Sequence, residues 1–122
     1  MSPGAVPGRH GPHEVSGQDV ESLTTKRIGV VIGVLTMELT IPGAMSLKDK
    51  RRVIKGLKDR LAHRHNISVA EVGDLDEHRR SVIGLAMGSN DRRFTDSCLS
   101  KIVDEVRQVH SLSLVDYDIE LL

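Results

Sequence analysis

The spacing of apolar residues divides the chain after residue 26 into segments of regular structure. Residues 28–41 are apolar and β-branched and end at Pro42-Gly43, which predicts a strand stopped by a turn. Residues 67–72 and 81–87 predict two shorter strands joined by a polar connection, together a β-hairpin. In residues 115–121 apolar side chains alternate with acids, so the last segment predicts a strand with one acidic face.

Two helices are predicted between these strands. The first begins after Ser46, a residue type that favours helix N-caps, and extends to about His63. The second begins after Asn90 or Asp91. Each has one apolar face, as expected of a helix that packs on a sheet. These faces consist of Leu47, Val53, Ile54, Leu57 and Leu61 in the first helix, and of Phe94, Leu99, Ile102, Val103, Val106 and Val109 in the second.

The predicted order of strand, helix, strand, strand, helix and strand is that of the ferredoxin-like α+β fold. Right-handed crossovers place both helices on one face of a four-stranded antiparallel sheet and leave the other face open. We therefore predict one domain over residues 27–122. Residues 1–26 are rich in Gly, Pro, Ser and His and lack apolar periodicity, which predicts a disordered tail. Alternatively, they are an extension upstream of the natural start of translation.

Composition narrows the possible functions. The 17 basic and 17 acidic residues cancel, so a nucleic acid would have to be bound by a local patch. The longest apolar run, residues 28–37, is shorter than the ~20 residues that span a bilayer, so no membrane partner is expected. The single cysteine, Cys98, indicates a reducing cytoplasmic environment and is expected to be an inert, buried thiol. The histidine spacing fits no zinc site and no nucleotide-binding loop is found, so we predict neither metal nor cofactor.

The first helix is strongly basic. Between Ser46 and Arg64 there are eight basic residues and two acids, which gives the segment a charge of +6. A helical wheel places five of the bases on the arc opposite the apolar face. We call this set the basic stripe, and it consists of Lys48, Arg51, Arg52, Lys55 and Lys58. Such a row suits a phosphate backbone, although an ordinary solvated helix face has the same composition.

The predicted fold brings the start of the first helix and the hairpin loop to the same end of the sheet. The loop supplies acids followed by His78, Arg79 and Arg80, and the helix N-terminus at Ser46 favours an anion. Lys50 projects towards the apolar side of its helix, where it either reaches the rim or pairs with a hairpin carboxylate. The alternative is that ion pairs between loop acids and helix bases merely fix the loop.

The open face of the sheet is not expected to bind RNA by stacking bases on aromatic side chains. The only aromatic residues are Phe94, expected in the helix core, and Tyr117, expected on the core side of the last strand. The open face carries Val30, Ile32 and Val34 on the central strand, and it is predicted to be covered by a second copy of the chain.

Four segments together resemble a known family. They are Glu38-Leu39, Ser46-Leu47-Lys48-Asp49-Lys50-Arg51-Arg52, Asn66-Ile67-Ser68-Val69-Ala70-Glu71-Val72 and His78-Arg79-Arg80-Ser81. Their order and spacing resemble the YlxP-like family, domain of unknown function 503, over about residues 28–122. The resemblance implies a small bacterial ferredoxin-like protein without established catalytic residues. Its genes often lie beside those of translation and ribosome-maturation factors, which implies an association with RNA or ribosomes.

The leading hypothesis is an uncharacterised, non-enzymatic protein that binds structured RNA, ribosomal RNA first of all, and forms a homodimer. The RNA- or anion-binding candidates are Ser46, Lys48, Lys50, Arg51, Arg52, Lys55, Lys58, His78, Arg79 and Arg80, with Lys50 expected to orient the hairpin. The alternative is a dimeric protein-interaction or structural module with no nucleic-acid partner. A third hypothesis, an enzyme that uses Lys50 with Asp76 or Glu77 as an acid–base pair, requires a perturbed lysine.

Overall fold

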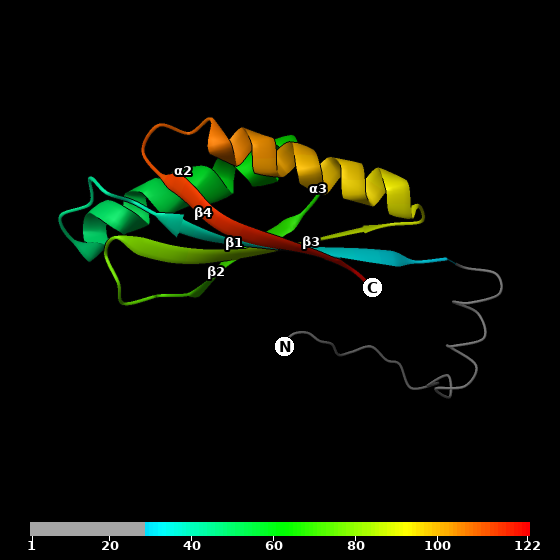
Figure 1. The fold of residues 1–122 in the computed structure, drawn as a ribbon, viewed down its shortest axis with the longest axis horizontal. Helices are drawn as coiled ribbons and strands as arrows, with labels where there is room; N and C mark the ends of the chain where they lie inside the picture. The colour runs from blue at the N-terminus through cyan, green and yellow to red at the C-terminus, as the bar shows by residue number, and fades with distance from the viewer. Residues whose placement is uncertain (1–28) are drawn as a thin grey trace.

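Six elements follow one another in the order strand, helix, strand, strand, helix, strand (Figure 1). The computed structural model describes residues 29–122, so the predicted tail, residues 1–26, lies outside the described residues. The elements are β1 (Val31–Thr40), α2 (Leu47–Arg64), β2 (Ser68–Gly73), β3 (Arg80–Ser89), α3 (Arg92–Arg107) and β4 (Ser113–Leu121). The strands form one antiparallel sheet in the order β2-β3-β1-β4, which confirms the ferredoxin-like α+β fold.

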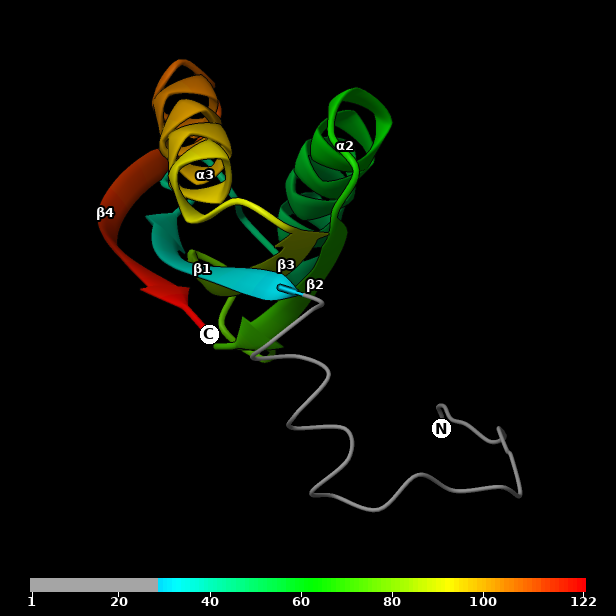
Figure 2. The same ribbon diagram turned by 90° about the vertical axis from the view of Figure 1, so that its right-hand side faces the viewer.

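The protein has two layers, with both helices on one face of the sheet (Figure 2). In this view α3 lies above β1 and β4, and α2 lies on the side of β2 and β3. β1 alternates between the two faces as its sequence predicts, because successive side chains of a strand point to opposite sides. The core between the layers includes Leu35, Met37, Leu39 and Ile41 from β1, Ile54, Leu57 and Leu61 from α2, and Leu99, Ile102, Val103 and Val106 from α3.

The start of α3 agrees with the prediction in its cap and differs from it in the position of Phe94. Asp91 is its N-cap and accepts a hydrogen bond from the backbone N–H of Phe94 at 2.9 Å. The prediction that Phe94 belongs to the core is wrong, because its side chain is 57% exposed. Thr95 takes the core position in this turn, since it lies one turn before Leu99 on the same face, whereas Phe94 is rotated by about 100° from it.

The last strand also differs from a simple alternation. A register shift in its pairing with β1 lies opposite Glu38 and Leu39, and it leaves Val115 61% exposed. Tyr117 lies opposite Met37 on the helix side of the sheet, as predicted, but at the edge, where it is 41% exposed. The guanidinium of Arg107 on α3 covers its ring, 5.4 Å from the centroid.

Helix α3 packs tightly on the sheet at Gly33. A Cβ atom there would overlap the side chain of Thr95 and lie 2.8 Å from Cδ1 of Leu99. We therefore expect Gly33→Ala to lower the free energy of unfolding by about 1–3 kcal/mol, measured by urea denaturation. The control is Gly56→Ala on α2, where nothing lies within 4 Å, and it should stabilise by about 0.5–1 kcal/mol. Equal stabilities for Gly33→Ala and the native protein would contradict the packing of α3 on β1.

Candidate nucleic-acid interface

Ser46 is the N-cap of α2, as its sequence predicts, and the cap is reciprocal. The hydroxyl of Ser46 accepts a hydrogen bond from the backbone N–H of Asp49 at 3.1 Å, and Asp49 Oδ2 accepts one from the N–H of Met45 at 2.9 Å. The helix dipole favours a negative charge at this end. The carboxylate of Asp49 already supplies that charge, so Ser46 serves the helix as its cap.

The basic stripe lies on the solvent side of α2, opposite the side that packs on the sheet. Lys48, Arg51, Arg52 and Lys55 are exposed, and Lys58 is half-buried. Within residues 29–122, Lys55 is the member of the stripe that forms an ion pair, with Asp59 at 2.7 Å. The hydrogen bond to that carboxylate, together with its charge, raises the pKa of Lys55. The five side chains thus form a row of basic groups, of which only Lys55 is paired with a carboxylate of residues 29–122.

Lys50 points the other way and is completely buried, although it lies in the same turn as the stripe. Its ammonium group donates to the carbonyl oxygens of Asp74 at 2.7 Å and Arg80 at 3.1 Å, and it lies 3.4 Å from that of Leu75. It also pairs with Glu71 Oε2 at 2.9 Å. Three hydrogens therefore meet four acceptors, and the charge of Lys50 is compensated inside the protein.

These contacts confirm one prediction made for Lys50 and contradict another. It pairs with a carboxylate of the hairpin and orients the hairpin loop, as expected. The prediction that it contacts RNA or another anion is wrong, because a fully buried ammonium group with all its protons engaged cannot reach a ligand. Its carboxylate partner is Glu71 on β2 and not Asp76 or Glu77, so the geometry proposed for an acid–base pair is absent from the described hairpin.

Glu71 is the residue of this cluster that the sequence analysis missed. It occupies a core-facing position of β2, beside Ile83 of β3, and its carboxylate also accepts a hydrogen bond from the Ser81 hydroxyl at 2.7 Å. The sequence pattern contains the information needed to predict it, since β2 has one acid at a core-facing position and α2 has one lysine at a core-facing position. A buried charge requires a partner of opposite charge, so the two residues are expected to pair.

The hairpin loop joins the start of α2 at one end of the sheet, as the predicted topology requires. Arg79 donates through Nε to the carbonyl oxygen of Ala44 at 3.2 Å, which ties the loop to the segment before the helix. Arg80 is exposed and lies 3.8 Å from the carboxylate of Glu77. His78 is half-buried. Arg79 at the end of the loop and Arg80 at the start of β3 thus lie at the end of α2 at which the basic stripe begins.

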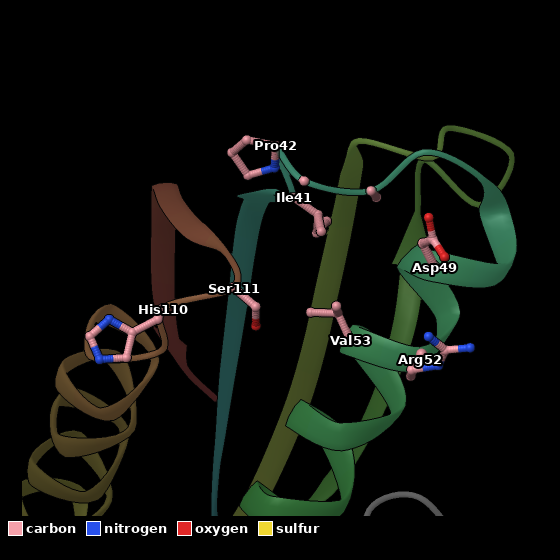
Figure 3. Close-up of a pocket in the computed structure, with 9 residues that line it drawn as sticks. Ile41, Pro42, Asp49, Arg52, Val53, His110 and Ser111 are labelled. Atoms are coloured by element: carbon pink, nitrogen blue, oxygen red, sulfur yellow. The ribbon is translucent and has the colours of Figure 1, made fainter.

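A pocket of about 370 Å³ lies next to the basic stripe (Figure 3). Its walls come from three segments: the turn after β1, the first two turns of α2, and the connection between α3 and β4. The lining residues are Ile41, Pro42, Gly43, Ala44, Asp49, Arg52, Val53, His110 and Ser111. Sequence analysis did not predict this pocket, because its segments meet only in the folded protein.

The open face of the sheet contains the predicted dimer residues. Val30 is 52% exposed, Ile32 is 36% exposed and Val34 is half-buried. A shallow groove of about 340 Å³ crosses the same face and is lined by Val34, Thr36, Ser68, Ala70, Val72, Gly84, Leu85 and Ala86. The pairing of β4 with β1 puts an acidic row along the edge of this face, which consists of Asp116, Asp118 and Glu120 beside Glu38.

Cys98 is partly exposed, so the prediction that it is buried is wrong. It lines a third pocket, of about 390 Å³, together with Phe94 and His65. His65 hydrogen-bonds through Nε2 to Glu105 at 2.8 Å, which connects the end of α2 to α3. Within residues 29–122, no group of three or more His, Cys, Asp or Glu residues is placed to hold a metal ion. Neither α2 nor α3 combines the length and the apolar character that a membrane span needs.

Comparisons with known proteins indicate the family of the chain and leave its function open. Residues 32–119 match the model of the family described as "Protein of unknown function (DUF503)". The uncharacterized protein YlxP of Bacillus subtilis (strain 168) is 34% identical over 73 residues, which are 60% of this chain and 79% of that protein. Among solved structures, the de novo designed protein Foldit4 is similar over 76% of this chain and 93% of its own, with a TM-score of 0.42 and 12% identity.

Proposed function

The chain belongs to the DUF503 family, and from the surface of α2 we propose that it is a cytoplasmic protein that binds structured RNA without catalysing a reaction. The basic stripe carries the proposal. It is a row of basic side chains along one helix, four of them exposed, and Lys48, Arg51 and Arg52 have no ion-pair partner among residues 29–122. Phosphate contacts of this kind supply most of the sequence-independent affinity of proteins for nucleic acids.

The fold supports the proposal by holding the row in place. The helix is anchored on one side by Ile54, Leu57 and Leu61 in the core, and at its start by the buried ammonium group of Lys50. Arg79 and Arg80 add cations beside the start of the stripe, from a loop that Lys50 holds. A rigid cationic row longer than one helical turn suits a regular phosphate backbone, so a folded RNA is the expected partner.

Co-sedimentation with purified ribosomal subunits tests the proposal, because ribosomal RNA is the leading candidate. The protein is sedimented through density gradients at low and at moderate salt. We expect co-migration with a subunit at low salt and weaker co-migration at moderate salt. The release of counterions from the RNA favours binding, and it becomes less favourable as the salt concentration rises. Absence from the subunit fractions under both conditions would count against a ribosomal partner.

A second candidate function, a dimeric interaction module, is favoured by the exposed apolar side chains of the open face. The acidic row limits how two copies could stack there. A two-fold axis perpendicular to the strands would place β4 over β4 and bring like charges together, which costs energy. An axis parallel to the strands and close to β3 would keep both acidic rows at the rim and bury Ile32 and Val34.

This second function predicts a change of mass in solution. Ile32→Lys should convert a dimer to a monomer in sedimentation equilibrium, because it places a charge in the apolar contact. Leu75→Lys is the matched control, since Leu75 is 54% exposed in the hairpin loop away from this face. A native protein that sediments as a monomer at all concentrations would remove the dimeric module.

A further inference from the structure

The pocket beside the basic stripe has the features of a site for a flat ring. We propose that it holds one unpaired nucleobase of an RNA strand whose phosphates lie along the basic stripe, and that it prefers guanine. The inference rests on the proposed function and adds to it a preference for RNA with an extruded base.

The size of the pocket suits one ring system. Its volume of about 370 Å³ is at the lower end of the range of roughly 300–1,000 Å³ for ligand sites. Apolar groups form much of its wall: Ile41 and Ala44 are almost completely buried beneath it, and Val53 lines its side. In Figure 3, Ile41, Val53 and Ser111 converge from three segments on the same space, whereas the ring of His110 is turned away from Val53.

The polar groups of the pocket favour a base over a phosphate. Asp49 Oδ2 accepts the hydrogen bond of Met45, and the carboxylate keeps further lone pairs that can accept from a ligand. A carboxylate repels an anion but accepts hydrogen bonds from amino and imino groups. Guanine presents two such donors side by side on its Watson–Crick edge, whereas each of the other bases presents one such group. The hydroxyl of Ser111 can donate or accept on the opposite wall.

The position of the pocket connects it to the proposed path of the RNA. Arg52 belongs both to the basic stripe and to the lining of the pocket, so a phosphate bound by Arg52 would lie beside the pocket. The other two pockets described above lie near the end of α2 and on the open sheet face, and neither is lined by a residue of the basic stripe. Proteins that recognise RNA commonly bind bases that are splayed out of loops and bulges.

Binding of two fluorescent RNA stem-loops tests the inference. The two differ only in a single bulged guanine, which one contains and the fully paired one lacks. We expect the native protein to bind the bulged RNA roughly tenfold more tightly, because removing the apolar faces of one base from water adds affinity of that order. Ser111→Trp should fill the pocket from an exposed position and remove this preference, while affinity for the paired RNA and its salt dependence stay unchanged.

Two further variants define the cause. Ser100 is also an exposed serine, on α3, and Ser100→Trp should keep the preference for the bulged RNA. Asp49→Asn can still accept the hydrogen bond of Met45 but replaces the other carboxylate oxygen with an amide donor, so it should reduce the preference for a bulged guanine severalfold. It should leave a bulged uridine, which also presents carbonyl acceptors, less affected.

The outcomes separate the pocket from the proposed function. Equal, salt-dependent affinity of the native protein for both RNAs would overturn the base site and leave the phosphate interface standing. A Ser111→Trp protein that loses affinity for both RNAs equally would also overturn it, because the pocket would then not distinguish a base. Failure of the native protein to bind either RNA would overturn the proposed function, and the base site with it.

Discussion

Replacing Lys50 with methionine is expected to lower the free energy of unfolding by about 3–5 kcal/mol, which is the range for breaking one side of a buried ion pair. Methionine has a similar length and fills the space, so the loss is electrostatic. Glu71, only 16% exposed, would keep its charge without the lysine, and the carbonyl oxygens of Asp74 and Arg80 would lose their donor. Urea denaturation followed by circular dichroism measures the change.

Two variants assign this loss to the buried pair. Lys48→Met removes an exposed positive charge near the start of the same helix and should change stability by no more than about 0.5 kcal/mol. The double variant Lys50→Met with Glu71→Met removes both charges, and it should be more stable than Lys50→Met alone by at least about 1 kcal/mol. If Lys50→Met unfolds at the same urea concentration as the native protein, the ammonium group does not hold the hairpin loop.

Reversing three charges of the basic stripe is expected to weaken RNA binding by on the order of a hundredfold or more at low salt. Lys48, Arg51 and Arg52 are exposed, so replacing them with glutamate removes three phosphate contacts and adds repulsion without disturbing the core. Acids in the first turns of a helix are also compatible with its dipole, so the helix should remain folded. Fluorescence anisotropy with a labelled RNA stem-loop measures the affinity.

The second helix offers a matched control for this change. Arg92, Arg93 and Lys101 are exposed bases on α3, two of them at its start, and their replacement with glutamate alters the net charge by the same amount. If binding depends on the basic stripe, this variant should lose much less affinity than the α2 variant. Equal losses for the two variants would show that only net charge matters, and the assignment of the interface to α2 would be wrong.

The fold could be predicted from local patterns because each element signals its own boundaries. The turn Pro42-Gly43 ends β1, Ser46 caps α2 and Asp91 caps α3, and each of these signals lies within a few residues of the element it defines. The exposure of Phe94 and Val115 could not be predicted in this way. It depends on which turn of α3 faces Gly33 and on the register of β4 against β1, and both are set by contacts distant in the sequence.

The same distinction holds for the candidate site: features within one element can be predicted, and features that combine several elements cannot. The basic stripe follows from the periodicity of one helix, and the structure places its members on the predicted side. For Lys50 the sequence predicts the side of the helix but not full burial, because its partners Glu71, Asp74 and Arg80 come from the hairpin. The pocket cannot be predicted from local patterns, since Ser111 approaches Val53 only after three separate segments have packed together.

The dependence of RNA affinity on salt tests the central claim most directly. The association constant of the native protein for the labelled stem-loop is measured between about 50 and 200 mM salt. Binding of about five phosphates by exposed bases of α2 and the hairpin loop predicts a slope of log K against log salt of roughly −4 to −5, and the α2 charge reversal should bring the slope towards about −2. A native slope near zero would contradict the account, because an interface made by the basic stripe cannot release so few counterions.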